Sequence, residues 1–279
     1  MHLTIASKGG FCFGVKKAVD TAIKASEERQ DKKIYTYGPI IHNSHVIKRL
    51  DDMGIQVITD LKQGQDQIVI VRSHGVPFAF YEEAEKLNIE VIDTTCPFVR
   101  KVQNLAKKYW DDGYKVVILG NPKHPEVVGI NGWAHDEAIV IQDEEDIDKL
   151  PADKEQKLCI LAQTTLSLTK WETMTEKINL LFKDTQCYNT ICSATRQRQE
   201  ECEVIAKKSD YMIVVGGKNS SNTQKLYEIS KKHCKNAIHI ESVSDLVVNN
   251  ILKYDSIGVV AGASTPNWII KEIKDKLEK

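Results

Sequence analysis

The sequence predicts an α/β fold, arranged as a pseudo-threefold trefoil of three small parallel-sheet subdomains. Three cysteines, Cys12, Cys96 and Cys192, each stand between a short β-like segment and a helix-like segment. From each cysteine, the next β-rich run ends in a glycine 26, 24 and 24 residues further on. Such constant spacing indicates an internal repeat, and alternating strands and helices predict parallel sheets. The three glycines are Gly38, Gly120 and Gly216.

Each repeat continues with the same series of elements. A second β-rich segment follows the glycine about twenty residues later, and a third one ends in a polar loop before a longer amphipathic helix. The second segments are Ile55 to Ile58, Ala138 to Ile141 and Ala237 to Ile240. The polar loops contain Ser73-His74, Gln163-Thr164-Thr165 and Gly262-Ala263-Ser264.

The N-terminal segment is expected to complete the third repeat. Residues 2–6 form a spare strand before Cys12, whereas the third repeat ends at Lys279 without such a strand. We therefore expect subdomains at 13–96, 97–192 and 193–279, the last completed by residues 1–12. The carboxyl ends of parallel strands share one edge of a sheet, where ligands bind. Three cysteines and three polar loops are therefore expected to meet at one central point.

Composition and charge exclude several classes of protein. The 38 basic residues nearly balance the 39 acidic ones, which argues against nucleic acid or an anionic membrane as the main partner. No apolar run approaches the length of about 20 residues that a membrane helix needs, and no secretory signal is visible. We expect a cytoplasmic protein. Seven cysteines in a reducing compartment then favour metal binding or catalysis over disulfides.

The repeated cysteines favour an iron–sulfur centre. Each precedes a predicted helix, whose positive end stabilises a thiolate, and Pro97 is suited to the first helical position after Cys96. None lies in a CxxC pair, which disfavours a zinc ribbon. A 4Fe-4S cluster on three cysteines leaves one iron open to act as a Lewis acid. The other cysteines are interpreted as structural: Cys159, Cys187, Cys202 and Cys234.

Neutral polar side chains recur at matched positions in the three repeats. Together with helix N-termini, such groups are suited to bind a diphosphate. Glu126 is the one carboxylate among them, and it is a candidate proton donor or acceptor, with a solvated loop glutamate as the alternative. The matched polar residues are His42, Asn43, His74, His124, Gln163, Thr164, Thr165, Ser220, Ser221, Asn222 and Ser264.

Distinctive motifs run along the whole chain. The first ones are Gly10-Phe11-Cys12-Phe13-Gly14-Val15, Ile41-His42-Asn43, Arg72-Ser73-His74-Gly75, Thr95-Cys96-Pro97 and Lys123-His124-Pro125-Glu126-Val127. The later ones are Gln163-Thr164-Thr165-Leu166-Ser167, Ile191-Cys192-Ser193-Ala194-Thr195, Lys218-Asn219-Ser220-Ser221-Asn222 and Ala261-Gly262-Ala263-Ser264. From end to end, these motifs resemble the family of 4-hydroxy-3-methylbut-2-enyl diphosphate reductases, which catalyse the last step of the non-mevalonate isoprenoid pathway.

The resemblance implies a role for each group of residues. Cys12, Cys96 and Cys192 would hold a 4Fe-4S cluster whose open iron binds the substrate hydroxyl. Glu126 would supply the proton that removes this hydroxyl as water, with Thr164 and His124 beside it. The products would be isopentenyl and dimethylallyl diphosphate. The diphosphate would be bound by His42, His74, His124, Ser220, Ser221, Asn222 and Ser264.

Partners and alternatives follow from the same chemistry. The resemblance also implies an external electron donor, ferredoxin or flavodoxin, reduced through an NAD(P)H-dependent reductase. An open iron is easily lost in air, which would leave a 3Fe-4S cluster. A redox-neutral 4Fe-4S dehydratase or a quinolinate synthase-like enzyme would also use three cysteines, but it would consume no electrons. An iron–sulfur sensor would need only the cysteines and would not explain the polar residues or Glu126.

Overall fold

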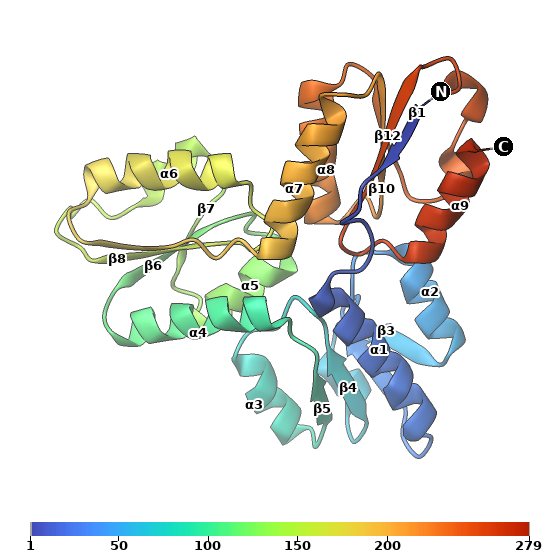
Figure 1. Cartoon of the computed structure of the whole chain (residues 1–279). Helices are drawn as coiled ribbons and strands as arrows, with labels where there is room; N and C mark the ends of the chain where they lie inside the picture. Colours follow the sequence, from blue (N-terminus) through green and yellow to red (C-terminus); the bar gives the residue numbers. More distant parts are fainter. Residues whose placement is uncertain (1, 279) are drawn as a thin grey trace. The chain divides into compact units, whose positions relative to one another are not determined.

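The computed structural model describes residues 2–278, which form three parallel four-stranded sheets of identical topology (Figure 1). In each sheet the strand order is second, first, third, fourth, counted along the repeat. The predicted α/β class and its three parallel-sheet subdomains are therefore confirmed. Sheet B has the order β3-β2-β4-β5, sheet C β7-β6-β8-β9, and sheet A β11-β10-β12-β1.

The chain divides into two compact units. Unit 1 comprises residues 1–16, 41–49 and 193–279, and it contains sheet A. Unit 2 comprises residues 17–40 and 50–192, and it contains sheets B and C. Two helices pass from one unit into the other along the chain, namely α1 (Phe13–Glu28) and α2 (Ser44–Asp52).

Sheet B has its most buried strand in the middle. All four residues of β4 are inaccessible to solvent because β2 and β5 flank this strand. The expectation of a longer closing helix is wrong here, since α3 spans only eight residues. The elements are β2 (Ile34–Tyr37), β3 (Ile55–Ile58), η1 (Leu61–Gly64), β4 (Ile68–Val71), α3 (Ala79–Lys86) and β5 (Glu90–Asp93).

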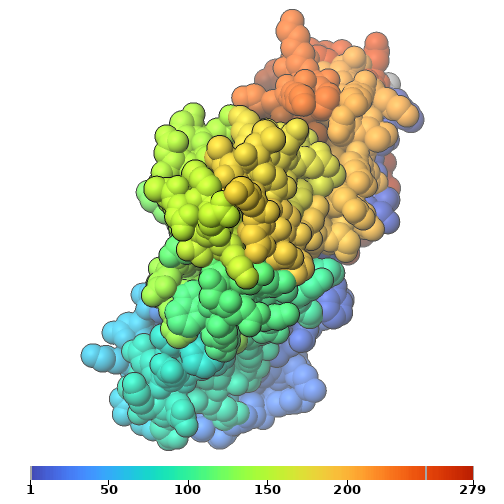
Figure 2. Space-filling view, turned by 90° about the vertical axis from the view of Figure 1, so that its left-hand side faces the viewer, coloured from blue at the N-terminus to red at the C-terminus, as the bar shows by residue number. Residues whose placement is uncertain are grey.

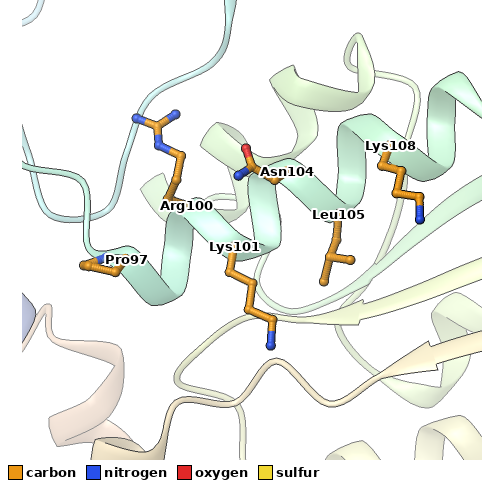
Figure 3. A pocket seen from close by; sticks show the side chains of 6 residues that line it. All are labelled: Pro97, Arg100, Lys101, Asn104, Leu105 and Lys108. Atoms are coloured by element: carbon orange, nitrogen blue, oxygen red, sulfur yellow. The ribbon is translucent and has the colours of Figure 1, made fainter.

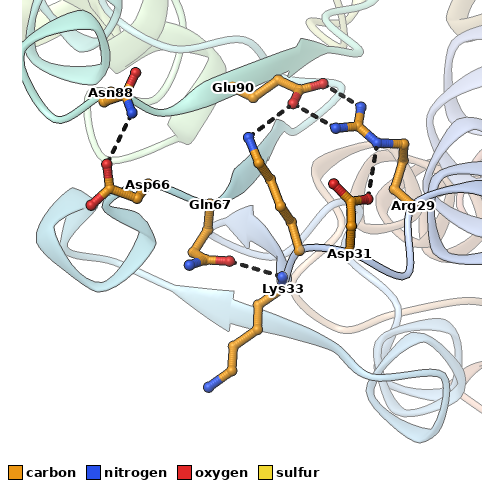
Figure 4. A network of polar contacts seen from close by, with 8 residues as sticks. Arg29, Asp31, Lys33, Asp66, Gln67, Asn88 and Glu90 are labelled. Carbon is orange, nitrogen blue, oxygen red and sulfur yellow. Dashed lines mark hydrogen bonds and ion pairs between the residues drawn. The ribbon is translucent and has the colours of Figure 1, made fainter.

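A polar network holds the end of α1 against sheet B (Figure 4). The Arg29 guanidinium donates two hydrogen bonds to Glu90, the first residue of β5, and Lys32 contacts the same carboxylate. These hydrogen bonds hold the pKa of Glu90 at about 2. Gln67 accepts a hydrogen bond from the Lys33 backbone at 2.9 Å. These contacts hold the segment after α1 against sheet B.

Sheet C is covered by helices on both faces, as Figure 1 shows. Ile160 of β8 packs with the α6 side of the core, whereas the neighbouring Leu161 packs with α4 and α5. In Figure 2, α6 forms part of the outer surface of unit 2 (yellow). The elements are α4 (Pro97–Asp111), β6 (Lys115–Leu119), α5 (Pro125–Asn131), η2 (Gly132–Ala134), β7 (Ile139–Ile141), η3 (Glu144–Lys149), β8 (Leu158–Ala162), α6 (Leu168–Leu181) and β9 (Thr185–Tyr188).

Sheet A confirms that the N-terminal strand completes the third repeat. Strand β1 pairs in parallel with β12, as β5 pairs with β4 and β9 with β8. Helix α9 packs on one face of sheet A, and α7 and α8 pack on the other. The elements are β1 (His2–Ile5), α7 (Ser193–Ala206), β10 (Tyr211–Val215), α8 (Ser221–His233), β11 (Ala237–Ile240), η4 (Val243–Asp245), η5 (Val248–Asn250), β12 (Ser256–Ala261) and α9 (Asn267–Leu277).

The three predicted glycines have the same hydrogen bond. Each follows the first strand of its sheet directly, and its N–H donates to the carbonyl of the last residue of the second strand. The pairs are Gly38 with Ile58 at 2.8 Å, Gly120 with Ile141 at 3.0 Å, and Gly216 with Ile240 at 2.9 Å. The repeat read from the spacing is therefore also a repeat of contacts.

Within residues 2–278, no helix has the length and hydrophobicity needed to cross a membrane.

Candidate functional site

One hydrogen bond recurs at the three repeated cysteines. In every repeat, the cysteine N–H donates to a backbone carbonyl in the loop after the neighbouring third strand. The acceptor is always the second residue beyond that strand. The loop that carries the cysteine and the polar loop are thereby tied together at the carboxyl edge of the sheet. The pairs are Cys12 with Ala263 at 3.1 Å, Cys96 with Ser73 at 3.0 Å, and Cys192 with Thr164 at 3.1 Å.

Each of these cysteines also stands at the start of a helix. Cys96 is the N-cap of α4, and Pro97 occupies the first turn as predicted. Cys12 and Cys192 directly precede α1 and α7. All three side chains are half-buried. The unpaired N–H groups and the dipole of a helix N-terminus favour a thiolate at such a position.

The other four cysteines lie in different surroundings. Burial in hydrophobic cores raises the pKa of Cys159 to about 12 and that of Cys202 to about 11, which keeps both as inert thiols. Cys187 is exposed in β9. Cys234 is buried just after the end of α8, where its extended backbone ends the helix. Three of these cysteines are buried, and the structural role expected for the exposed Cys187 stays a prediction.

Glu126 is a buried residue in the first turn of α5. Its predicted place in a loop, and the alternative of a solvated glutamate, are wrong because Pro125 and the His124 cap start a helix there. Only 2% of Glu126 is exposed. Thr164 donates its backbone N–H to Oε1 at 2.6 Å and its hydroxyl to Oε2 at 2.7 Å. The carboxyl group of Glu126 on α5 is therefore hydrogen-bonded to Thr164 in the loop after β8, and the carbonyl of this threonine accepts the Cys192 N–H.

Burial decides the protonation of Glu126. Desolvation raises its pKa to about 7, and the two hydrogen bonds from Thr164, which favour the carboxylate, oppose this rise. A carboxyl group with a pKa near neutrality can both release and regain a proton under physiological conditions. This property is typical of a general acid.

Two histidines of unit 2, His74 and His124, lie at the start of α5, the helix that carries Glu126. The His74 and His124 rings pack edge to face with centroids 5.4 Å apart. His124 Nδ1 accepts a hydrogen bond from the Glu126 backbone N–H at 3.2 Å. Since Nδ1 is an acceptor, the proton of the neutral ring lies on Nε2, where it can be donated to an anion.

A second group of predicted residues lies in unit 1. The Ser264 hydroxyl donates to the His42 carbonyl at 3.2 Å. Gly217 passes so close to the same carbonyl that a Cβ atom would lie 2.3 Å from this oxygen. Only glycine allows this approach, which holds the His42 backbone against the loop that leads into α8.

The start of α8 contains an unsatisfied buried amide. Ser220 is the N-cap, and its hydroxyl oxygen accepts from the Thr223 N–H at 3.4 Å. Asn222 is only 3% exposed, yet neither its side-chain oxygen nor its nitrogen has a hydrogen-bond partner. A buried amide without partners is costly, and a polar ligand would satisfy it. The helix N-terminus beside it favours an anionic ligand.

Several of the matched polar residues stabilise the loops themselves. The Asn43 side chain accepts the Val46 N–H and caps α2. Gln163 accepts from the Asn121 backbone and donates to the Thr165 hydroxyl. The Asn43 and Gln163 side chains therefore stabilise the loops that follow β2 and β8.

The predicted site residues are shared between the two units. The hydrogen-bonded set Glu126, Thr164 and Cys192 lies in unit 2, and its meeting with the residues of unit 1 stays a prediction. Unit 2 carries His74, Cys96, His124, Glu126, Thr164 and Cys192, and unit 1 carries Cys12, His42, Ser220, Ser221, Asn222 and Ser264.

Helix α7 contains two positioning residues that sequence reasoning missed. Arg198 donates hydrogen bonds to the Ala194 carbonyl and to the Gly10 carbonyl, both at 2.9 Å. Glu201 accepts from the backbone N–H groups of Ser7 and Lys8, at 2.7 and 2.9 Å. Although burial opposes it, these hydrogen bonds lower the pKa of Glu201. The available signal was the weak apolar stripe of this helix, since the charged Arg198 is buried on the same helix as the apolar Cys202, Ile205 and Ala206.

Comparisons with known proteins agree with these features. The model of the family described as LytB protein matches residues 3–278. A 4-hydroxy-3-methylbut-2-enyl diphosphate reductase of Alkaliphilus oremlandii is 48% identical over 278 residues, which cover 99% of both chains. The protein of the same name from Caldanaerobacter subterraneus subsp. tengcongensis is 43% identical and is covered to 97%.

Two solved structures are also similar over the full chain. A structure of (E)-4-hydroxy-3-methyl-but-2-enyl diphosphate reductase, described as the terminal enzyme of the non-mevalonate pathway, matches with a TM-score of 0.74 at 39% identity. This match covers 100% of this chain and 99% of the other. The corresponding reductase from Plasmodium falciparum matches with a TM-score of 0.95 at 29% identity, covering 100% of this chain and 88% of the other.

The raised pKa of Glu126 predicts a pH-dependent stability. The folded state holds the proton up to about pH 7, whereas an unfolded glutamate loses it near pH 4.5. This contribution to stability is complete below about pH 4.5 and is lost as the pH rises through 7. We expect wild type to lose about 3 kcal/mol across this window relative to Glu126→Gln, which cannot titrate. Urea unfolding of both proteins between pH 4.5 and 8 measures this difference.

The exposed Glu176 of α6 supplies a control. The stability of Glu176→Gln should follow the wild-type pH dependence. If the free energies of unfolding of wild type and Glu126→Gln differed by the same amount at every pH in this window, the pKa of Glu126 would not be raised.

Proposed function

Because this chain belongs to the LytB protein family, we propose that it reduces 4-hydroxy-3-methylbut-2-enyl diphosphate to isopentenyl and dimethylallyl diphosphate. Its relatives are named as reductases of this substrate. One similar solved structure is described as the terminal enzyme of the non-mevalonate pathway. The observation that carries the proposal is the buried Glu126, which is hydrogen-bonded twice to Thr164 while the Thr164 carbonyl binds the Cys192 backbone. Thr164 therefore forms hydrogen bonds both with Glu126, the proposed proton donor, and with the backbone of Cys192, one proposed cofactor ligand.

We propose that Cys12, Cys96 and Cys192 hold a 4Fe-4S cluster. Their equivalent backbone hydrogen bonds, helix N-termini and half-buried side chains support this ligand set. When bound, such a cluster supplies single electrons and, at the iron without a cysteine, a Lewis-acidic position for the substrate hydroxyl. Loss of that iron in air would leave a 3Fe-4S cluster.

The diphosphate is proposed to bind the neutral donors at the other predicted positions. The buried Asn222 amide, both of whose polar atoms have no partner, fits a ligand that brings oxygen atoms to this helix N-terminus. The hydroxyl hydrogen of Ser220 can point to the same ligand, because its oxygen already accepts a hydrogen bond from the helix. The full proposed set is His42, His74, His124, Ser220, Ser221, Asn222 and Ser264.

Glu126 is proposed to protonate the leaving hydroxyl group. Hydroxide is a poor leaving group, so a proton from a carboxyl group converts it to water as the C–O bond breaks. The substrate gains two electrons and one proton, and the hydroxyl group leaves with a second proton. Thr164 keeps the carboxyl group in a fixed orientation, while His124 Nε2–H offers a further donor. An external ferredoxin or flavodoxin, reduced through an NAD(P)H-dependent reductase, is the proposed electron source.

The proposal is tested by counting electrons. The anaerobic holoprotein, reduced with dithionite and methyl viologen, should consume two electrons for each allylic diphosphate and release the two isoprenoid diphosphates. Dye absorbance and phosphorus NMR measure both quantities. Conversion of the substrate to a hydrated or dehydrated product without dye oxidation would instead identify a redox-neutral dehydratase.

The ligand set predicts which cysteines the cluster requires. Serine at Cys12, Cys96 or Cys192 should remove most of the visible absorption near about 400 nm, since each substitution deletes one of three thiolates. Cys187→Ser is the matched control, because Cys187 is an exposed cysteine only five residues before Cys192. Iron and sulfide analysis of each anaerobic protein provides the measurement. Loss of the cluster in Cys187→Ser, with retention in Cys192→Ser, would overturn the ligand set.

The role of Glu126 predicts a specific kinetic defect. Glu126→Gln keeps the size of the side chain but removes the acidic proton, so kcat should fall by roughly 100-fold or more. Substrate affinity and cluster content should change little. Dye-driven kinetics, together with the iron content, distinguish these quantities. A near wild-type kcat would assign proton delivery to another group, with His124 the next candidate.

A further inference from the structure

The segment that carries His74 is a β-turn between two contacts with helix α4. The Gly75 N–H donates to the Arg72 carbonyl at 3.0 Å, and this hydrogen bond closes the turn around His74. Just before His74, the Ser73 carbonyl accepts the N–H of Cys96, the residue that caps α4. The start of α4 therefore holds one side of this turn.

The second contact is made by Gln103, a glutamine in the middle of α4. Its side chain is completely buried, and its Nε2 donates to the Val76 carbonyl at 3.3 Å. Gln103 lies seven residues after Cys96, which places it two turns, or about 10 Å, along the same face of the helix. The Val76 carbonyl also accepts the Trp133 indole N–H at 3.0 Å. Two side-chain donors thus converge on one carbonyl, two residues beyond His74.

The backbone of the turn is packed directly against both helices. Gly75 has a φ of +72°, and a Cβ atom at this residue would lie 2.4 Å from Gln103 Nε2. A Cβ atom at Gly129 of α5 would lie 3.4 Å from the Gly75 carbonyl carbon. The turn is therefore packed between α4 and α5, the helix that carries Glu126.

Only one end of the Gln103 amide is bonded. Its Oε1 is buried and has no hydrogen-bond partner within residues 2–278. An unsatisfied buried oxygen is unfavourable, so an apolar side chain of the same length would make the fold no less stable. The amide therefore adds little to stability, and its effect lies in the N–H group that reaches Val76.

We propose that Gln103 is a positioning residue for His74, which sets the direction in which this histidine presents its ring to the diphosphate of the substrate. The inference rests on the proposed function, because it takes His74 as a donor to that group. Gln103 acts on the backbone: its bond to Val76, together with the bond between Cys96 and Ser73, holds both ends of the turn. Hydrogen bonds weaken steeply when a donor turns away from its acceptor, so a small rotation of the turn lowers affinity.

The next residue along α4 provides a matched control. Asn104 also carries an amide, but it is exposed and lines a groove on the outer side of the helix (Figure 3). Its side chain extends from the same side of α4 as that of Arg100, which lines the same groove. Asn104→Ala therefore changes the same helix while leaving the bond between Gln103 and Val76 in place.

Equilibrium binding to the oxidised holoprotein tests the proposal, because no turnover occurs without a reductant. Gln103→Met keeps the length of the side chain but has no donor, and it should raise the dissociation constant for the allylic diphosphate by about fivefold or more. Asn104→Ala should stay within about twofold of wild type. His74→Ala should raise the constant by about 10-fold or more. In the His74→Ala background, Gln103→Met should change it by less than about twofold, because the two residues act as one unit. Isothermal titration measures each constant.

Two further measurements separate positioning from a structural role. Gln103→Met should unfold within about 3 °C of wild type, since the substitution also removes an unsatisfied buried oxygen. Its dye-driven turnover at saturating substrate should stay within about twofold of wild type, because the proton donor is untouched. Trp133→Phe is a second variant, which removes the other donor to Val76 and keeps a ring against Phe78. It should weaken binding in wild type but not in His74→Ala.

Several outcomes would overturn the proposal. They are unchanged affinity in Gln103→Met, an equal loss in Asn104→Ala, or a loss of the same size when His74 is already alanine. If Gln103→Met does not fold, an additive loss in Trp133→Phe and His74→Ala would have the same effect. Unchanged binding in His74→Ala alone would remove this histidine from the diphosphate site and the inference with it. Absence of dye-driven reduction in wild type would instead refute the proposed function.

Discussion

The hydrogen bond from each repeated cysteine to the neighbouring loop is the constraint on which the candidate site depends. It joins the turn after an edge strand to the turn after the strand beside it, and it recurs with the same register in all three sheets. Because the edge strand comes from a different part of the chain in sheet A, β1 must pair with β12 before Cys12 can reach its acceptor. The strand that closes the third repeat is therefore a requirement of the site as well as of the sheet.

Burial gives the site its chemistry. A glutamate in water is ionised at neutral pH, but Glu126 is covered by the core under α5 and keeps its proton up to about pH 7. Thr164 opposes this effect with two hydrogen bonds and also fixes the carboxyl group. Thr164 thus links the Glu126 carboxyl group to the Cys192 backbone, so the position of this carboxyl group depends on both loops. The burial of the Asn222 amide without partners also has a chemical consequence, because its two polar atoms are left to bind a polar ligand.

A repeat does not make its copies equivalent in function. The three helices after the cysteines share their position and the bond at their start, yet α4 contains four basic residues and one acidic residue, whereas α7 contains two basic and three acidic residues. Helix α7 instead uses the buried Arg198 and the half-buried Glu201 to hold the loop before Cys12. The shared backbone fixes where a thiolate can lie. The repeat does not constrain the surface side chains, which differ in charge from one of these helices to the next.

The sequence by itself determined the repeat, the fold class and the candidate residues, because glycine, cysteine and strand spacing are local properties. It predicted the second strands almost to the residue, and it identified 2–6 as the missing strand. It did not predict that Glu126 lies in a helix, or that this side chain is buried and meets Thr164 38 residues away. Those facts arise when β6 and β8 pair and bring their following loops together. The pKa of Glu126 and the unsatisfied Asn222 amide were decided only by tertiary structure, since desolvation depends on what surrounds a side chain and not on its neighbours along the chain.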